Sequence, residues 1–187
     1  MTNLPFPPDA RADELLAIRC QLGERAAFDT LIARFQLPLW RYARNLTGSD
    51  GAADDASQEV WLRVLRAIGR LRDGARLRSW LFGIAHRVLM DRLREQYAQP
   101  PIADSEPDEH AAAMLDDSIE SDLAAMFDEL GRMPLVEREV LTLFYLRELS
   151  LDEVAQVLAI PVGTVKSRLY RARKLLRHQL DLKGVQP

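Results

Sequence analysis

The sequence predicts an all-α protein with two small helical domains joined by a flexible acidic linker. Apolar residues recur at helical spacing along most of the chain, and no stretch keeps the alternation of a half-buried strand. A segment rich in proline and acidic residues separates the two helical parts. With 187 residues, 48% of them hydrophobic, the chain can build two small cores. We expect residues 1–97 and 119–187 to form the domains and residues 98–118 the linker.

The first two helices follow from apolar spacing and from the residues that interrupt it. One helix is expected from about residue 12 to residue 21. A second begins near Glu24 and carries a long apolar stripe. We expect it to bend at Pro38, because proline removes a backbone hydrogen-bond donor. The stretch TGSDGAAD then ends this helix.

Two more helices complete the first domain. The third is expected over residues 52–68, with Val60 and Val64 on its buried stripe. A basic loop, GRLRDGARLR, separates it from the fourth helix. That helix begins at SWLFGIAHR, where Ser79 is the expected N-cap because its hydroxyl can accept from a free backbone N–H.

The second domain is expected to contain four helices. The first spans residues 119–132, and the next carries Pro134 in its first turn, where proline is tolerated. A short amphipathic helix follows, with Ser150 as N-cap and Glu153 three residues later, which is a capping box. A tight connection at residues 159–161 leads to the last helix, and this pair has the pattern of a helix-turn-helix.

Charge is distributed unevenly along the chain. The whole sequence has 25 Lys and Arg against 28 Asp and Glu, a net charge of −3. Residues 162–177 nevertheless carry six cations and no acid, and residues 25–97 carry 13 Arg against 8 acids. Residues 98–130 carry 10 acids and no Lys or Arg. Two basic blocks on either side of an acidic segment indicate a polyanionic partner.

The last helix has an inner and an outer face. Its inner stripe, Val165, Leu169 and Ala172, should pack on the preceding short helix. The outer face contains Thr164, Ser167, Arg168, Arg171 and Lys174, with Lys166 and Arg173 at its flanks. A solvated basic helix or a membrane-surface helix would have the same charge, but the capped helix-turn-helix favours a DNA groove. The N-terminal part of such a helix contacts base edges, and flanking cations contact phosphates.

These motifs resemble the sigma-70 family of bacterial transcription factors. LGRMPLVEREVLTLFYLRELSLDEVAQVLAIPVGTVKSRLYRARKLLR resembles the region 4 domain. AFDTLIARFQLPLWRYARNLTGSDGAADDASQEVWLRVLRAI and RSWLFGIAHRVLMDRLRE are similar to the two halves of region 2. With only a short linker between them, the order resembles the extracytoplasmic-function (ECF) sigma factors. The resemblance implies a protein that directs transcription in response to stress or an extracytoplasmic signal. Its implied partners are core RNA polymerase (β′ clamp coiled coil and β flap), promoter DNA and an anti-sigma factor.

The resemblance places core-polymerase binding on the helix ADDASQEVWLRV. Helical spacing puts Asp55, Glu59 and Leu62 on one face, opposite the buried stripe. The implied set is Asp54, Asp55, Gln58, Glu59, Trp61 and Leu62. Trp61 is either an interface anchor or the edge of the core, and a solvated acidic face is the alternative for the whole set.

The resemblance also implies that the minus-10 promoter strand is held by the basic loop and the start of the next helix. Single-stranded DNA favours a cationic track with places for unstacked bases. The candidates are Arg70, Arg72, Arg76, Arg78, Ser79, Trp80, His86 and Arg87. Trp80 is expected to contribute more to the core than to base stacking, since large aromatics usually pack. Arg87 stands where many family members have Asn, which leaves the minus-10 preference open.

Other functional classes find less support. No phosphate loop or nucleophile elbow indicates an enzyme, and the sequence predicts no catalytic residue, metal site or cofactor. The stretch DSEPDEH lacks the spacing of a calcium loop, and Cys20 has no second cysteine to pair with. No signal peptide or apolar span is present, which predicts a cytoplasmic protein without membrane insertion. An ordinary helix-turn-helix regulator that binds duplex DNA alone, and an adaptor for an acidic partner, remain the alternatives.

Overall fold

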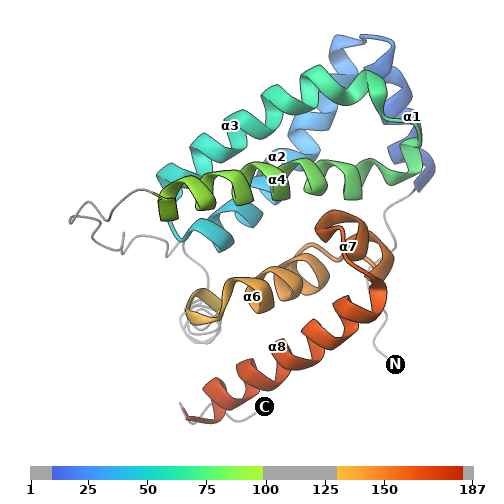
Figure 1. Ribbon diagram of the computed structural model, residues 1–187. Coiled ribbons are helices and arrows are strands. Elements are labelled where there is room, and N and C mark those ends of the chain that lie inside the picture. Colours follow the sequence, from blue (N-terminus) through green and yellow to red (C-terminus); the bar gives the residue numbers. More distant parts are fainter. Residues whose placement is uncertain (1–9, 99–129, 183–187) are drawn as a thin grey trace, which may run out of the picture.

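The computed structural model describes residues 10–98 and 130–182, which form an N-terminal and a C-terminal helical unit (Figure 1). The N-terminal unit contains α1 (Ala10–Gln21), α2 (Arg25–Thr47), α3 (Asp50–Ala67) and α4 (Leu77–Ala98), with two 3-10 turns, Ile68–Arg70 and Gly74–Arg76. The C-terminal unit contains α6 (Leu135–Leu141), a π-helical turn (Thr142–Leu146), α7 (Leu151–Leu158) and α8 (Val162–Leu182). Neither described part contains a strand, as the sequence predicts. The predicted linker lies outside the described residues, apart from Ala98, as does most of the predicted helix 119–132.

α2 remains one helix through Pro38. Its buried stripe follows helical spacing and includes Leu31, Phe35, Leu39 and Tyr42. The helix ends at Gly48, whose left-handed backbone (φ 74°) favours glycine and whose N–H donates to the carbonyl of Arg44 at 2.9 Å. Ser49 then caps α3 by accepting from the backbone N–H of Ala52 at 3.4 Å.

The predicted start of α4 is wrong by two residues. Helical geometry begins at Leu77, so Ser79 lies inside the helix and caps nothing. Asp73 takes the capping role, because its carboxylate accepts from the N–H of Ala75 at 3.1 Å and starts a 3-10 turn that runs directly into α4. The hydroxyl of Ser79 instead donates to the carbonyl of Arg76 at 3.1 Å.

The C-terminal unit confirms most of the local prediction. The capping box at the start of α7 is present, with Ser150 and Glu153 each bonded to the other's backbone N–H. Ala159 adopts the left-handed conformation (φ 52°) and ends α7 before α8 begins. Pro134 differs from the prediction, because it is the N-cap of α6 with extended ψ and lies just before the first turn.

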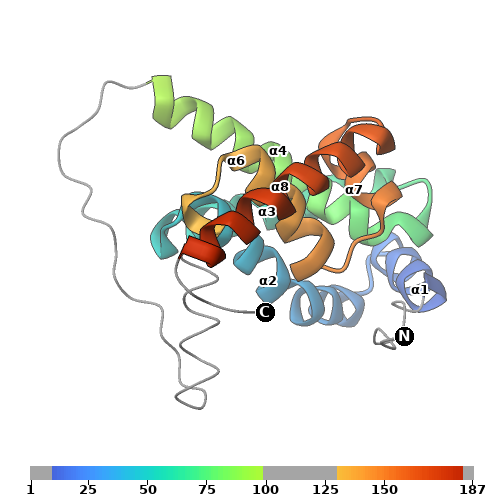
Figure 2. The same ribbon diagram turned by 90° about the horizontal axis from the view of Figure 1, so that it is seen from below.

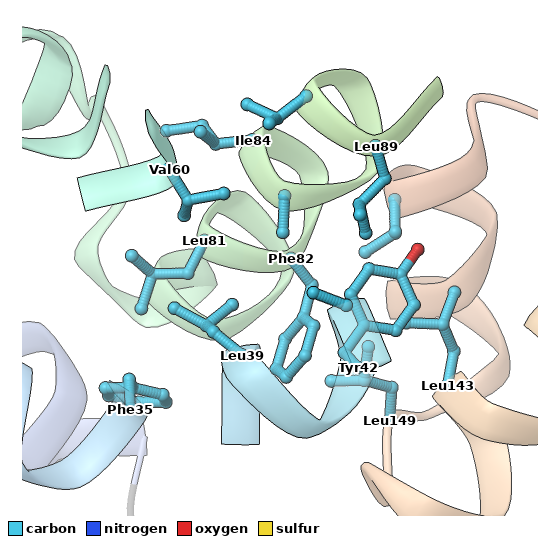
Figure 3. Packing of buried hydrophobic residues seen from close by; sticks show 14 of the residues in the cluster. Phe35, Leu39, Tyr42, Val60, Leu81, Phe82, Ile84, Leu89, Leu143 and Leu149 are labelled. Carbon is cyan, nitrogen blue, oxygen red and sulfur yellow. The ribbon is translucent and has the colours of Figure 1, made fainter. Parts of the chain in front are cut away.

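The two units share one continuous hydrophobic core. Tyr42 of α2 and Phe82 of α4 meet edge to face, with ring centroids 5.5 Å apart. Figure 3 shows that Leu143 and Leu149 of the C-terminal unit lie beside this aromatic pair. All four side chains are at most 1% exposed. The C-terminal unit is therefore docked on the N-terminal one through apolar packing.

The docking leaves α3 and α8 on opposite outer surfaces. Figure 1 shows α3 on one side of α2 and α4, and the C-terminal unit on the other side. α7 packs against α4, and α8 packs on α6 and α7. The view from below in Figure 2 agrees, because α8 lies in front and α3 behind it.

Candidate nucleic-acid and polymerase interfaces

α8 presents the basic face that the sequence predicts. Its inner residues Val165, Leu169 and Ala172 are buried, and they are held against the buried side chains of α7. The predicted DNA-reading residues lie on the other side, where Lys166, Ser167, Arg171, Arg173 and Lys174 are exposed and Thr164 and Arg168 are half-buried. None of the seven predicted side chains is therefore buried, and the buried stripe separates Arg168 on one flank of α8 from Lys166 and Arg173 on the other.

Little acidic charge neutralises this surface. The Arg171 guanidinium lies 3.8 Å from the Glu137 carboxylate, and the contact is mostly solvent-exposed on the arginine side. Arg173 donates to the Tyr145 hydroxyl at 3.5 Å, which adds no negative charge. Within residues 10–98 and 130–182, Lys166, Arg168 and Lys174 make no ion pair. The face therefore remains available to an anionic ligand such as a phosphate backbone.

α3 carries the predicted acidic face on the outside of the N-terminal unit. Asp54, Asp55, Gln58 and Leu62 are exposed, and Val60 and Val64 are buried on the opposite side, as predicted. Leu65, which the sequence analysis did not select, is also 50% exposed one turn beyond Leu62. Two exposed leucines beside carboxylates give this helix a mixed apolar and acidic surface.

Part of the acidic charge on α3 is already paired within the unit. Glu59 is half-buried and contacts Arg63 at 2.5 Å and Arg92 at 3.1 Å. Asp55 is 3.9 Å from Arg92 and keeps 69% of its side chain exposed. Asp54 accepts from the indole N–H of Trp40 at 2.7 Å. Asp54 and Asp55 are therefore the acids of this set that remain exposed to a basic partner, whereas Glu59 is already paired with two arginines.

Trp61 lies at the edge of the core. Its ring is half-buried and packs against the buried cluster. Its indole N–H is buried and makes no hydrogen bond to the described residues. A buried indole donor without an acceptor is uncommon, so this position has an unused hydrogen-bonding group next to the acidic face.

The predicted minus-10 residues divide into two groups. Arg70, Arg72, Arg76 and Arg87 are exposed, and Arg76 pairs with Asp73 at 3.0 Å. Trp80 is half-buried against the core, in line with its expected packing role. The remaining three, Arg78, Ser79 and His86, all touch the C-terminal unit. These eight residues therefore do not form one open surface in the docked structure.

The contacts of the second group are specific. Arg78 donates to the backbone carbonyl of Arg147. The Ser79 hydroxyl, whose single proton is shared with the Arg76 carbonyl, also lies 3.1 Å from the Gln156 side-chain carbonyl of α7. His86 Nδ1 lies 2.7 Å from Glu139 Oε1.

Glu139 is the functional residue that sequence reasoning missed. It is 4% exposed, and its Oε1 also accepts from the Tyr42 hydroxyl at 2.6 Å. A signal was present in the sequence, because Glu139 stands four residues from both Leu135 and Leu143, on an apolar stripe that continues from α6 into the π-helical turn. A carboxylate at a core position needs polar partners, and both of these come from the other unit.

A pocket of about 390 Å³ lies at the contact between the two units, which we call the seam. It is lined by Arg34, Phe35, Pro38, Arg78, Phe82, Leu146, Arg147 and Glu148. Arg147 donates to the Pro38 carbonyl at 3.4 Å and is partly shielded from water. Burial lowers the pKa of Arg147 to about 10, and repulsion from Arg41 and Arg78 acts in the same direction. This end of the seam is therefore electropositive and incompletely packed.

Other kinds of site find no support in the described residues. Residues 10–98 and 130–182 contain no group of His, Cys, Asp and Glu that would hold a metal ion, and the predicted acidic stretch DSEPDEH lies outside them. Cys20 is buried, and burial raises the pKa of its thiol. None of the described helices is long and apolar enough to cross a membrane.

Comparison with known proteins agrees with this architecture. The family description "Sigma-70 region 2" matches residues 31–98, and "Sigma-70, region 4" matches residues 124–176. The RNA polymerase sigma-H factor of Pseudomonas aeruginosa is 30% identical over 184 residues, covering 90% of this chain and 94% of the relative. The ECF RNA polymerase sigma factor SigM of Mycobacterium tuberculosis is 34% identical over 172 residues, covering 91% of this chain and 85% of the relative.

A solved structure extends the comparison to the fold. The structure of CnrH in complex with the cytosolic domain of CnrY has a TM-score of 0.70 and 27% sequence identity to this chain. The likeness covers 91% of this chain and 98% of the solved one. Two family regions in the expected order, relatives of 30% and 34% identity that are matched over most of their length, and this shared fold lead to one conclusion. The chain belongs to the ECF group of the sigma-70 family, whose members are non-enzymatic transcription initiation factors.

Proposed function

We propose that this chain binds core RNA polymerase and directs it to a specific set of promoters. The observation that carries the proposal is the capped helix-turn-helix whose last helix, α8, exposes an almost unpaired basic face. Residues 1–97 act as the region 2 domain, residues 98–118 as the linker and residues 119–187 as the region 4 domain.

The region 4 domain reads the minus-35 element in the major groove. Thr164, Ser167, Arg168 and Arg171 face the base edges, and Lys166, Arg173 and Lys174 face the phosphates. An arginine that pairs bidentately with guanine discriminates between bases, so Arg168 and Arg171 carry the specificity. In addition, this domain contacts the β flap of the polymerase.

The region 2 domain binds the β′ clamp coiled coil through α3. The contact set is Asp54, Asp55, Gln58, Glu59, Trp61 and Leu62. The exposed Asp54 and Asp55 supply negative charge, and the exposed Leu62 supplies an apolar contact. Leu65 extends this surface by one turn.

The same domain holds the minus-10 strand once the promoter opens. Its contact set is Arg70, Arg72, Arg76, Arg78, Ser79, Trp80, His86 and Arg87. The exposed arginines supply a cationic track for the single strand. Arg87, which replaces the Asn common in the family, alters the base preference at one position of that element.

An anti-sigma factor controls the protein and links it to an extracytoplasmic or stress signal. Support comes from the related CnrH, whose solved structure contains the cytosolic domain of a second protein, CnrY. The chain acts in the cytoplasm, where RNA polymerase and the promoters are found.

Transcription of fragmented genomic DNA by purified core polymerase, with and without this chain, tests the proposal. Discrete start sites that appear only with the chain, preceded by two common upstream elements, are the expected result. If no new start site appears and the chain alone binds particular duplexes in a salt-sensitive way, the protein is an ordinary helix-turn-helix regulator.

A further inference from the structure

The seam between the two units is fastened by polar contacts as well as by apolar packing. Hydrogen bonds cross the seam from α2 and α4 to the C-terminal unit at both of its ends. At one end Glu139 meets Tyr42 and His86. At the other end Arg78 and Arg147 are donors to backbone carbonyls of the opposite unit.

Glu139 of the C-terminal unit has its polar partners in the N-terminal unit. Its Oε1 accepts from Tyr42 at 2.6 Å and lies 2.7 Å from His86 Nδ1, and the side chain is almost fully buried. Both polar partners belong to the N-terminal unit, so the buried carboxylate is satisfied only when the units are docked. Replacing the carboxylate by a group that cannot accept leaves the buried Tyr42 hydroxyl without its acceptor and His86 Nδ1 without its polar partner. Glu139 therefore makes the docked arrangement specific.

The docked unit covers part of the proposed minus-10 surface. Arg78, Ser79 and His86 each give their polar atoms to the C-terminal unit. Ser79 is 4% exposed and cannot reach a DNA strand in this arrangement. DNA and the C-terminal unit thus compete for the same three side chains.

The distance between the two promoter elements is too large for the docked protein to bind both at once. Elements centred near positions −35 and −10 lie about 25 base pairs apart, which is roughly 85 Å of duplex at about 3.4 Å per base pair. A compact protein of this length has a radius of gyration of about 16 Å. The two units are in direct contact through α4 and α7. One docked molecule therefore cannot occupy both elements.

We propose that the C-terminal unit, fastened by Glu139, is an autoinhibitory cover over the minus-10 surface of the same chain. This inference rests on the proposed function, because it takes the minus-10 role of α4 from it. Docking keeps the free protein from binding promoter DNA, and opening exposes Arg78, Ser79 and His86. Glu139 is a positioning residue in this scheme and contacts no DNA itself.

A distance measurement tests the docking without any DNA. The labels are placed at exposed sites by Ala26→Cys on α2 and His178→Cys on α8, in a full-length Cys20→Ala background. Electron–electron double resonance should give one short, narrow distance in the parent protein. Glu139→Lys should give a broad distribution at longer distances, and Glu139→Gln, which keeps the shape, a partial shift. Asp29→Lys, the same charge change at an exposed site of α2, is the control.

A binding measurement tests the inhibition. The probe is a pre-melted promoter fragment returned by the genomic transcription assay, titrated with the free protein. Glu139→Lys should bind it at least tenfold more tightly than the parent, with Glu139→Gln in between and Asp29→Lys unchanged. Unchanged distances in both Glu139 variants, or opening without any gain in DNA binding, would overturn the proposal.

The two arms also separate this inference from the proposed function. If the genomic assay returns no promoter, the proposed function fails and the inhibitory role fails with it. The distance arm still measures whether Glu139 fastens the units. If promoters are found and the distances do not change, only the autoinhibitory cover is wrong. Helical content by circular dichroism confirms that each variant is folded.

Discussion

The acidic face of α3 and the N-terminal part of α4 belong to the same helical unit, but only one of them is open. Asp55, Gln58 and Leu62 are exposed residues of α3. Figure 1 shows α3 on the side of α2 and α4 that faces away from α6, α7 and α8. Arg78 and Ser79 lie under the C-terminal unit and are bonded to it. The two surfaces serve two proposed partners, polymerase and promoter DNA.

This difference indicates an order of events. The docked chain can present α3 to the polymerase without rearrangement, because no part of the described C-terminal unit covers it. It cannot present the minus-10 surface until the units separate. If both proposals hold, polymerase binding through α3 can precede promoter opening, and the contacts that hold the units together control the second step.

The largest expected effect comes from reversing the charge of the exposed face of α3. Asp55→Lys with Gln58→Lys places two cations on the outer face of α3, where a basic partner helix would be repelled. We expect affinity for core polymerase to fall at least a hundredfold, measured by pull-down or fluorescence anisotropy. Asp29→Lys should bind normally. Unchanged polymerase binding with a folded double variant would mean that α3 is not the contact.

Tyr42→Phe should weaken the docking of the two units without changing the shape of the side chain. The variant loses the 2.6 Å hydrogen bond to Glu139, and hydrogen bonds to charged groups contribute about 1.5–3 kcal/mol. The docked population should fall, as measured by the label distances, while polymerase binding through α3 stays the same. A loss of polymerase binding in this variant would show that the two surfaces are coupled after all.

Arg168→Ala probes a surface that is open in both states. If Arg168 reads a guanine, its loss should reduce specific transcription by about 1–3 kcal/mol, or roughly 5- to 150-fold. The same relative loss is expected in the parent and in the Glu139→Lys background, because α8 is exposed whether or not the units are docked. Single-round transcription on one cognate promoter and on guanine-substituted versions measures both quantities. Unchanged specific transcription by Arg168→Ala would mean that Arg168 does not contact a base.

The smallest effect is a pH dependence of docking at alkaline pH. Burial raises the pKa of Tyr42 well above its usual value of 10, and the Glu139 carboxylate acts in the same direction. The undocked hydroxyl has a lower pKa, so its contribution to docking is complete below about pH 10 and is lost as the pH rises further.

Arg147 acts in the opposite direction, because its lowered pKa of about 10 favours docking as the pH rises. That contribution is shared by the parent and Tyr42→Phe. The difference between their label distances between pH 9 and pH 11 should therefore isolate Tyr42. Parallel curves for the two proteins would contradict the assignment.

Local signals in the sequence predicted most of the fold. The capping box and the tight connection at residues 159–161 position the helix-turn-helix within about twelve residues, so short-range patterns suffice there. The buried stripe of α3 and the outer face of α8 were also predicted, since helical spacing alone sorts them. Ser79 was misplaced as a cap because an additional 3-10 turn, started by Asp73, extends the helix backwards.

The docking could not be predicted by the same means. Glu139 and Tyr42 are separated by 97 positions, and no local pattern relates them. In the sequence Arg78, Ser79 and His86 have the composition of an open nucleic-acid surface, and only the arrangement of the two units shows that they are covered. Which contacts of a binding surface are free is a tertiary property.

The shared core also has a consequence for synthesis on the ribosome. Phe82 belongs to the unit made first, and Leu149, which lies beside it in the finished core, is added 67 residues later. At about 5–20 residues per second, synthesis of these residues takes roughly 3–13 s, during which the aromatic pair of α2 and α4 has no C-terminal unit to pack against. During that interval the nascent chain exposes an apolar patch next to a cationic loop. The newly made N-terminal unit is therefore open to chaperones, to nucleic acid and to other nascent copies before its own C-terminal unit closes over it.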